Sequence, residues 1–323
     1  MTEQHPNPIC AFSISAEGVC KPISSAQPIE LAATSTGYCW FHFDLNDPAF
    51  EPWAKGALPL MVANALIQPE TRPRCDRMED GLILNLRGVN LNPGADPDDM
   101  VSIRLWVREG LIVSTRVRKI WAMDAIRLQM ETGKGPISVS AFLAELAKGL
   151  TKRIEKVSVD LVEDTDKLEE DALDSDQALT SELASLRQSV IKLRRFVRPQ
   201  CEAITDLASG KAWALDTHVA NLLSETANRT TRTMEELDAT SDRLKAIQDH
   251  LDILHTSALG RNSYVLSVVA AIFLPLGFLT GLFGINVGGM PWLDANYGFW
   301  FVTGGSALLG IVLFMVFRHL KWL

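Results

Sequence analysis

One polar side chain, Asn286, follows directly on a long apolar run and could bind a cation. It belongs to the tripeptide Gly284–Ile285–Asn286, which comes after an uncharged stretch over residues 264–283. An asparagine at this position can cap the end of a helix. In a ring of subunits its amide oxygens would instead converge, and neutral oxygen dipoles can hold a hydrated divalent cation without trapping it. The tripeptide therefore predicts either a capped turn or the mouth of a cation pore.

A row of glycines precedes this asparagine. Gly277, Gly281 and Gly284 stand at positions i, i+4 and i+7, so they share one face of a helix. Pro275, just before them, removes one backbone hydrogen bond within the apolar run. A smooth glycine face favours close helix contact in lipid, or it lines a pore that is wide enough for a hydrated ion. Two spans per chain cannot enclose a pore, so the second interpretation requires a ring of subunits.

Catalytic chemistry is not indicated by any motif in the chain. The sequence contains no GxSxG, GxxxxGK[ST], HExxH or GxGxxG pattern, and its six histidines are dispersed. His250 and His255 are five residues apart, which places them on different faces of a helix. We therefore predict that the protein is not an enzyme and that these two histidines form no metal site; a proton-linked role for them stays open.

Acidic residues crowd the second half of a predicted helix over residues 138–174, whereas the next helix, over residues 181–197, is basic. One interpretation is that opposite charges face each other across this helical hairpin and that the excess acid is solvated. The other is that surplus carboxylates bind divalent cations, which favour oxygen ligands. Weak cytoplasmic metal sites are then expected among four residues: Glu163, Asp166, Glu169 and Glu170.

Two uncharged apolar runs, residues 264–283 and 297–317, are each long enough to cross a bilayer core of about 30 Å. The turn between them is short, so the runs predict a transmembrane hairpin. Arg261 precedes the first run, basic residues follow the second, and the turn contains a single acid, Asp294. The excess of positive charge on the inner side places both termini in the cytoplasm and the turn outside.

The segment before the hairpin is predicted to contain an α/β domain and then long helices. Residues 38–45 have the aromatic density of a strand, and residues 51–68 have helical spacing of apolar side chains. Residues 81–89, 100–108 and 111–117 predict a meander of three antiparallel strands. The expected organisation is an α/β domain (1–136), a helical hairpin (137–210), a stalk helix (211–263), a first span (264–283), an external loop (284–296), a second span (297–317) and a basic tail (318–323).

Composition excludes two further classes of protein. The chain of 323 residues has 31 basic and 39 acidic residues and a net charge of -8, which argues against nucleic acid as a partner. Its five cysteines are scattered and never form a CxxC pair, so we expect reduced thiols in a cytosolic domain. The first thirty residues lack the pattern of a cleaved signal peptide, so none is expected.

The string PLGFLTGLFGIN, the short turn, the second span and the terminal KWL resemble the CorA-type divalent metal transporters. The usual Gly-Met-Asn signature is Gly-Ile-Asn in this chain, which resembles the zinc-transporting ZntB branch of that family. The resemblance implies an α+β cytoplasmic domain, a long helical stalk and a C-terminal two-helix hairpin, assembled as a homopentameric funnel in the bacterial inner membrane. It also implies contacts with membrane lipids and with divalent metal ions, and no bound cofactor.

Carried onto this chain, the resemblance makes Gly284, Ile285 and Asn286 the outer selectivity mouth. The first span would line the pore through Ser263, Leu266, Ala270, Leu274, Gly277 and Gly281. Leu266 and Leu274 would then be hydrophobic constrictions that gate by dewetting.

The expected function is zinc transport through this pore, with proton coupling and the direction of transport left open. A magnesium, cobalt or nickel channel of the same architecture is the first alternative. A membrane-anchored coiled-coil scaffold or sensor that conducts no ions is the second.

Overall fold

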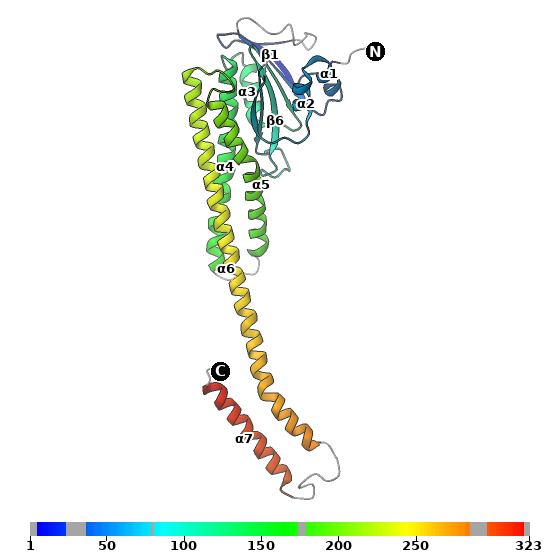
Figure 1. Cartoon of the computed structure of the whole chain (residues 1–323), viewed down its shortest axis with the longest axis vertical. Coiled ribbons are helices and arrows are strands. Elements are labelled where there is room, and N and C mark those ends of the chain that lie inside the picture. Colours follow the sequence, from blue (N-terminus) through cyan, green and yellow to red (C-terminus); the bar gives the residue numbers. More distant parts are fainter. Residues whose placement is uncertain (1–4, 24–36, 79–80, 174–178, 285–295, 320–323) are drawn as a thin grey trace. The chain divides into compact units, whose positions relative to one another are not determined.

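The computed structural model describes residues 5–23, 37–78, 81–173, 179–284 and 296–319 (Figure 1). The chain divides into two compact units, residues 1–247 and 248–323, and each is described by itself. The boundary between them falls inside α6 (Thr217–Gly284), a helix of 68 residues. The predicted stalk and first span are thus one continuous helix, which begins at Thr217 instead of residue 211.

A mixed sheet of seven strands forms the centre of the first unit, in the order β2-β1-β3-β7-β6-β5-β4. β4 to β7 form an antiparallel meander, and β7 pairs in parallel with β3. The predicted three-stranded meander and the aromatic strand are confirmed; the two short N-terminal strands and β4 were not predicted. The strands are β1 (Cys10–Ile14), β2 (Cys20–Pro22), β3 (Tyr38–Asp44), β4 (Arg74–Met78), β5 (Gly81–Gly88), β6 (Val101–Arg108) and β7 (Leu111–Arg116).

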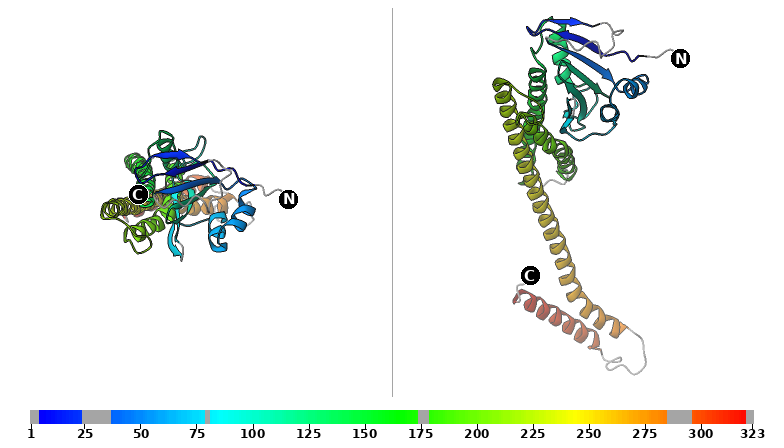
Figure 2. Two further views of the ribbon diagram at one scale, coloured as in Figure 1. Left: turned by 90° about the horizontal axis from the view of Figure 1, so that it is seen from above. Right: turned by 45° about the horizontal axis from the view of Figure 1, so that its top comes forward.

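Helices cover both faces of this sheet (Figure 2). One face packs against α1 (Phe50–Ala57) and α2 (Leu60–Ile67) around a core of aromatic and aliphatic side chains. These helices correct the prediction of a single helix over residues 51–68. Pro59 holds the preceding residue, Leu58, in an extended conformation (φ -117°, ψ 155°), so the first helix ends there.

The opposite face packs against three helices and the beginning of α6. They are α3 (Trp121–Glu131), which was not predicted, α4 (Val139–Leu173) and α5 (Leu179–Ala208). The predicted helical hairpin is confirmed as α4 and α5, although α5 continues beyond the predicted end at residue 197 and contains Pro199.

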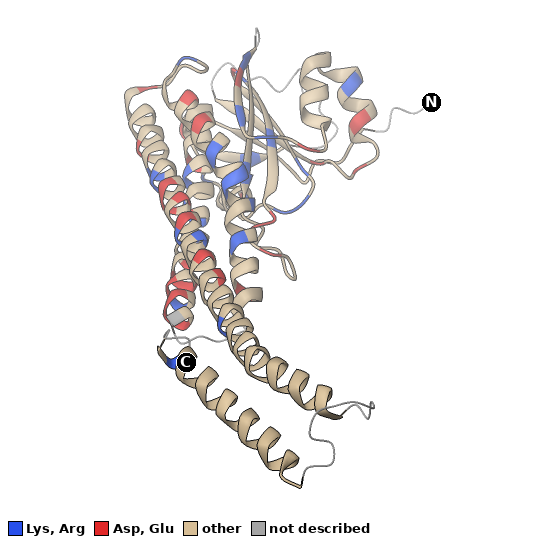
Figure 3. Cartoon of the chain, turned by 60° about the horizontal axis from the view of Figure 1, so that its bottom comes forward, with Lys and Arg blue, Asp and Glu red and all other residues tan. Residues whose placement is uncertain are grey.

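Acidic and basic residues are spread along α4, α5 and α6 (Figure 3), and several of them form ion pairs between helices. Arg194 and Arg198 of α5 pair with Asp238 of α6, at 2.5 Å and 2.9 Å. On α4, Glu155 pairs with Arg229 of α6. The interpretation that these acidic and basic residues of α4 and α5 face each other is therefore wrong, because α6 supplies their counter-charges.

Polar side chains of β3 and β7 form a buried hydrogen-bond network around His42. Its Nδ1 lies 2.8 Å from the Oγ of Ser114, which also accepts a hydrogen bond of 2.8 Å from the indole Nε1 of Trp40. His42 is 2% exposed. Burial lowers the pKa of this imidazole to about 3, and the charge of Arg116 contributes further. His42 is therefore neutral in the folded protein at physiological pH.

We expect acid to destabilise the first unit through His42. An unfolded histidine titrates near 6.5, so below that pH the unfolded chain binds a proton that the folded chain does not. Stability should fall from about pH 6.5 towards the folded pKa, by up to about 1.4 kcal/mol per pH unit. Between pH 7 and pH 5, the unfolding temperature of His42→Gln should fall less than that of wild type. His218→Gln, at an exposed position, is the control; equal slopes for H42Q and wild type would contradict the assignment.

Candidate ion-conducting helix face

Two apolar helices make up most of the second unit: the C-terminal part of α6 and α7 (Gly298–His319). Both are long and apolar enough to span a membrane, with mean hydropathies of 2.3 and 2.1 in their most apolar windows. Only 6% and 0% of those windows are buried within the chain. So much exposed apolar surface is unfavourable in water, and it is the arrangement expected of helices that contact lipid or other subunits.

One face of α6 packs against α7. Val268 is 6% exposed, and Ile272 and Leu276 are half-buried. On α7, the Cα of Gly310 is so close that an added Cβ would lie 3.9 Å from a methyl group of Leu276. Ser306 is half-buried one turn earlier on α7, so these two small residues lie on the packed side.

The predicted pore-lining residues lie on the other face of α6. Residues 266, 270, 274, 277 and 281 are separated from the packed positions by roughly half a turn, at about 100° per residue. All six predicted residues, including Ser263, are exposed, and Leu266 and Leu274 are 70% and 74% exposed. The predicted pore-lining residues thus lie opposite the packed positions, but Phe273 and Phe278 are also 67% exposed. Exposure alone does not single out a pore face, and the pore lining stays a prediction.

The glycines belong to the uncovered face. Within the described residues, a Cβ added at Gly277, Gly281 or Gly284 would meet nothing within 4 Å. Close packing against α7 therefore does not explain them.

The predicted selectivity mouth is only partly described. Gly284 is the last residue of α6. Ile285, Asn286 and Asp294 lie outside the described residues, so the mouth and the external acid stay predictions.

The acidic helix has a different role from the predicted one at two positions. Asp166 accepts a hydrogen bond of 2.6 Å from Arg243 of α6, and Glu169 pairs with the same guanidinium. Glu163 and Glu170 are exposed. In the parts of the chain that the structure describes, no group of three or more His, Cys, Asp or Glu residues is placed to hold a metal ion. The weak metal sites expected among these four residues therefore stay a prediction.

An α+β N-terminal domain, a long helix and two C-terminal apolar helices define a class of membrane protein with a large soluble part. Residues 35–319 match the family model described as CorA-like Mg2+ transporter protein, and the chain belongs to this family of transporters. This confirms the predicted family and the prediction that the protein is not an enzyme.

Individual relatives agree with this assignment. A zinc transport protein, ZntB of Pectobacterium carotovorum, is 35% identical over 323 residues, which cover 99% of this chain and 97% of that protein. The divalent cation transporter CmaX of Pseudomonas aeruginosa is 35% identical over 294 residues, 88% of this chain and 87% of that protein. The structure of the full-length CmaX protein has a TM-score of 0.80 at 31% identity and covers 100% of both chains. The predicted α+β domain, long helix and C-terminal hairpin are thereby confirmed.

The packed face of the hairpin can be tested at Gly310. Gly310→Leu places a side chain against Leu276, so we expect it to separate α6 from α7 and to lower the unfolding temperature of the detergent-solubilised protein. Gly304→Leu is the control, because a Cβ at Gly304 would meet nothing within 4 Å among the described residues. Equal unfolding temperatures for G310L and G304L would show that the contact contributes nothing.

Proposed function

We propose that the protein transports Zn²⁺ across a membrane through a pore lined by the uncovered face of α6. The observation that carries this proposal is the division of α6 into two opposite faces. One face packs against α7, whereas the other is apolar, uncharged and rich in glycine. A helix with these two faces can line a pore with one and pack against an outer helix with the other.

Zinc is the proposed ion for two reasons. The chain has Gly-Ile-Asn at residues 284–286, the departure from Gly-Met-Asn that pointed to zinc in the sequence. A relative named as a zinc transport protein is also similar along almost the whole chain. The name of the matching family supports Mg²⁺ as the alternative ion.

The proposed pore is formed by a ring of subunits, since two spans cannot enclose one, and we expect the homopentamer that the family resemblance implied. Uncharged walls suit a cation that keeps its water shell, because no carboxylate traps it. Leu266 and Leu274 would narrow the pore to two apolar rings that exclude water when closed. Gly277 and Gly281 would leave it wider on the side of the mouth.

In this proposal Gly284, Ile285 and Asn286 form the outer mouth, and Asp294 adds one negative charge per subunit outside. We place the protein in the bacterial inner membrane. Both termini are assigned to the cytoplasm, because the basic residues Arg261 and Arg318 flank the two apolar runs at the ends away from the turn. An uncharged pore sets neither the direction of transport nor its driving force. Proton coupling is therefore tested separately from zinc transport.

Zinc flux into liposomes that contain the purified full-length protein tests the proposal. We expect zinc uptake, measured with a zinc-sensitive dye inside the liposomes. Asn286→Ala should reduce this uptake markedly, because it removes the amide oxygens of the mouth. Competition with Mg²⁺, Co²⁺ and Ni²⁺ ranks the ions, and pH gradients of either sign test proton coupling. No zinc flux in wild type, together with flux of Mg²⁺, would select the alternative ion.

The constriction at Leu274 gives a second test. Leu274→Ala should widen the apolar ring and raise the resting zinc flux severalfold, because a larger opening stays hydrated. Leu308→Ala is the matched control, since Leu308 of α7 is 64% exposed and lies outside the proposed pore face. Unchanged flux in L274A would remove Leu274 from the pore lining, and the absence of any ion flux in all variants would favour the scaffold interpretation.

A further inference from the structure

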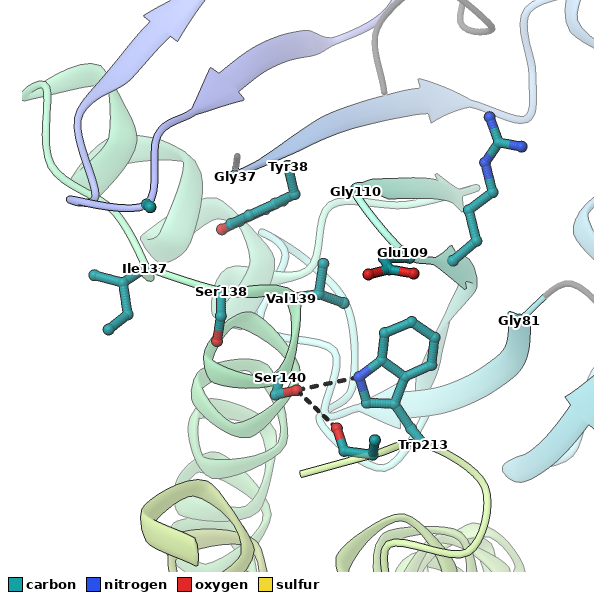
Figure 4. A pocket seen from close by; sticks show the side chains of 13 residues that line it. Gly37, Tyr38, Gly81, Glu109, Gly110, Ile137, Ser138, Val139, Ser140 and Trp213 are labelled. Atoms are coloured by element: carbon teal, nitrogen blue, oxygen red, sulfur yellow. Dashed lines mark hydrogen bonds between the residues drawn. The ribbon is translucent and has the colours of Figure 1, made fainter. Parts of the chain in front are cut away.

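Two cavities in the first unit differ in the charge of the side chains that line them. The larger, of about 960 Å³, lies beside the beginning of α4 (Figure 4). In it the indole Nε1 of Trp213 donates to the Oγ of Ser140 at 3.1 Å, and this hydroxyl donates to the carbonyl oxygen of Ala214 at 3.3 Å. These three groups satisfy one another, but the Nε of Arg108, which also lines this cavity, has no hydrogen-bond partner among the described residues. One arginine and one carboxylate, Glu109, line this cavity, so it carries no excess of positive charge.

The smaller cavity, of about 550 Å³, lies between the segment before β4, strand β5 and helix α5. We call it the arginine cavity, because four arginines and a single acid, Glu70, line it. Its volume is in the range of small-molecule sites. The arginines are Arg72, Arg74, Arg87 and Arg195.

Strand register explains how one row of the sheet becomes polar here. Asn85 of β5 is opposite Arg74 of β4 and Arg104 of β6, so the three side chains are cross-strand neighbours on one face. Arg87 is two residues further along β5 and therefore on the same face. Three basic residues thus surround one amide at this end of the sheet.

The polar groups of the arginine cavity lack partners although they are buried. Asn85 is 1% exposed and Thr71 is 5% exposed. The amide nitrogen and oxygen of Asn85 have no hydrogen-bond partner among the described residues, and the hydroxyl of Thr71 has none either. Buried polar groups are nearly always satisfied in folded proteins, by protein atoms, by ordered water or by a ligand, so these groups are available to a ligand with oxygen atoms.

Positive charge in the cavity is also left without carboxylate partners. Arg87 donates to the carbonyl oxygens of Thr71 and Met100 at 2.9 Å and 2.8 Å, and its guanidinium lies 3.8 Å from the ring centre of Phe196. Among the described residues, neither Arg87 nor Arg195 forms an ion pair with an acid, whereas Arg74 pairs with Asp76 at 3.2 Å.

The arginines at this end of the sheet repel one another. Burial lowers the pKa of Arg87, the charge of Glu70 raises it, and the charge of Arg195 lowers it again. Burial and the charge of Arg87 also lower the pKa of Arg104 to about 10. An anion beside these guanidiniums would offset the mutual repulsion that they experience.

We propose that the arginine cavity binds a phosphate group, either as inorganic phosphate or as the terminal phosphate of a nucleotide. Guanidinium groups match the oxygens of phosphate in pairs, and phosphate accepts several hydrogen bonds at once. Arg87 and Arg195 supply the charge, and the Asn85 amide and the Thr71 hydroxyl donate to oxygens of the same group. The site is independent of the proposed zinc pathway.

Isothermal titration of the full-length protein in detergent, without zinc and at constant ionic strength, tests this proposal. Inorganic phosphate and ATP are titrated separately, with chloride as the control anion. We expect saturable phosphate binding that is weakened about tenfold or more by Arg195→Glu and by Arg72→Glu, since one charge-assisted hydrogen bond accounts for roughly that factor. Arg232→Glu on α6, an exposed arginine outside the cavity, should bind as wild type.

A second variant separates a ligand site from a structural role of Asn85. Asn85→Leu keeps the approximate size of the side chain and removes its unpartnered polar atoms. We expect N85L to lose phosphate binding and to unfold at a temperature equal to or above that of ligand-free wild type.

Several outcomes would overturn the proposal: no phosphate or ATP binding by wild type, equal binding by R195E and R232E, or unchanged binding by N85L. If neither wild type nor R195E binds phosphate and R195E dissociates the oligomer, the arginine cavity is a contact between subunits. Tighter binding of ATP than of phosphate would identify a nucleotide as the source of the phosphate group.

Discussion

The exposed apolar surface of residues 264–283 and 298–317 is the constraint on which the second unit depends. Without lipid or other subunits, side chains such as Leu274 would remain in water at a cost of about 25 cal/mol for each Å² of apolar area. Packing against α7 covers only one face of α6, along Val268, Ile272 and Leu276. The remaining faces need other partners, and a ring of subunits in a bilayer supplies both lipid and protein.

Charge has the corresponding role in the first unit. The arginines of α6 bind carboxylates of α4, while Asp238 of α6 binds arginines of α5, so one helix joins its two neighbours. These pairs are partly exposed, and each contributes modestly to stability. The arginine cavity differs, because two of its arginines, Arg87 and Arg195, form no ion pair with an acid among the described residues, although Arg74 pairs with Asp76.

Several elements followed from local patterns. Period-two alternation predicted β5 and β6, the Glu109-Gly110 turn predicted β7, and uninterrupted apolar runs predicted both candidate spans. The division of α6 into two faces could not be predicted in the same way, because a uniformly apolar helix has no amphipathic period to mark its packed side. The split between α1 and α2 had a local signal at Pro59, which restricts the residue before it.

The amino-acid sequence by itself determined the two apolar helices, the glycine spacing and the Gly-Ile-Asn motif, since these depend on residue type and local order alone. Only the tertiary structure decided that the glycines of α6 face away from α7. It also decided that Asp166 and Glu169 form ion pairs with Arg243, and that Asn85 lies among arginines. Each of these depends on contacts between segments far apart in the chain. Such contacts are set by packing and strand register, and no local pattern encodes them.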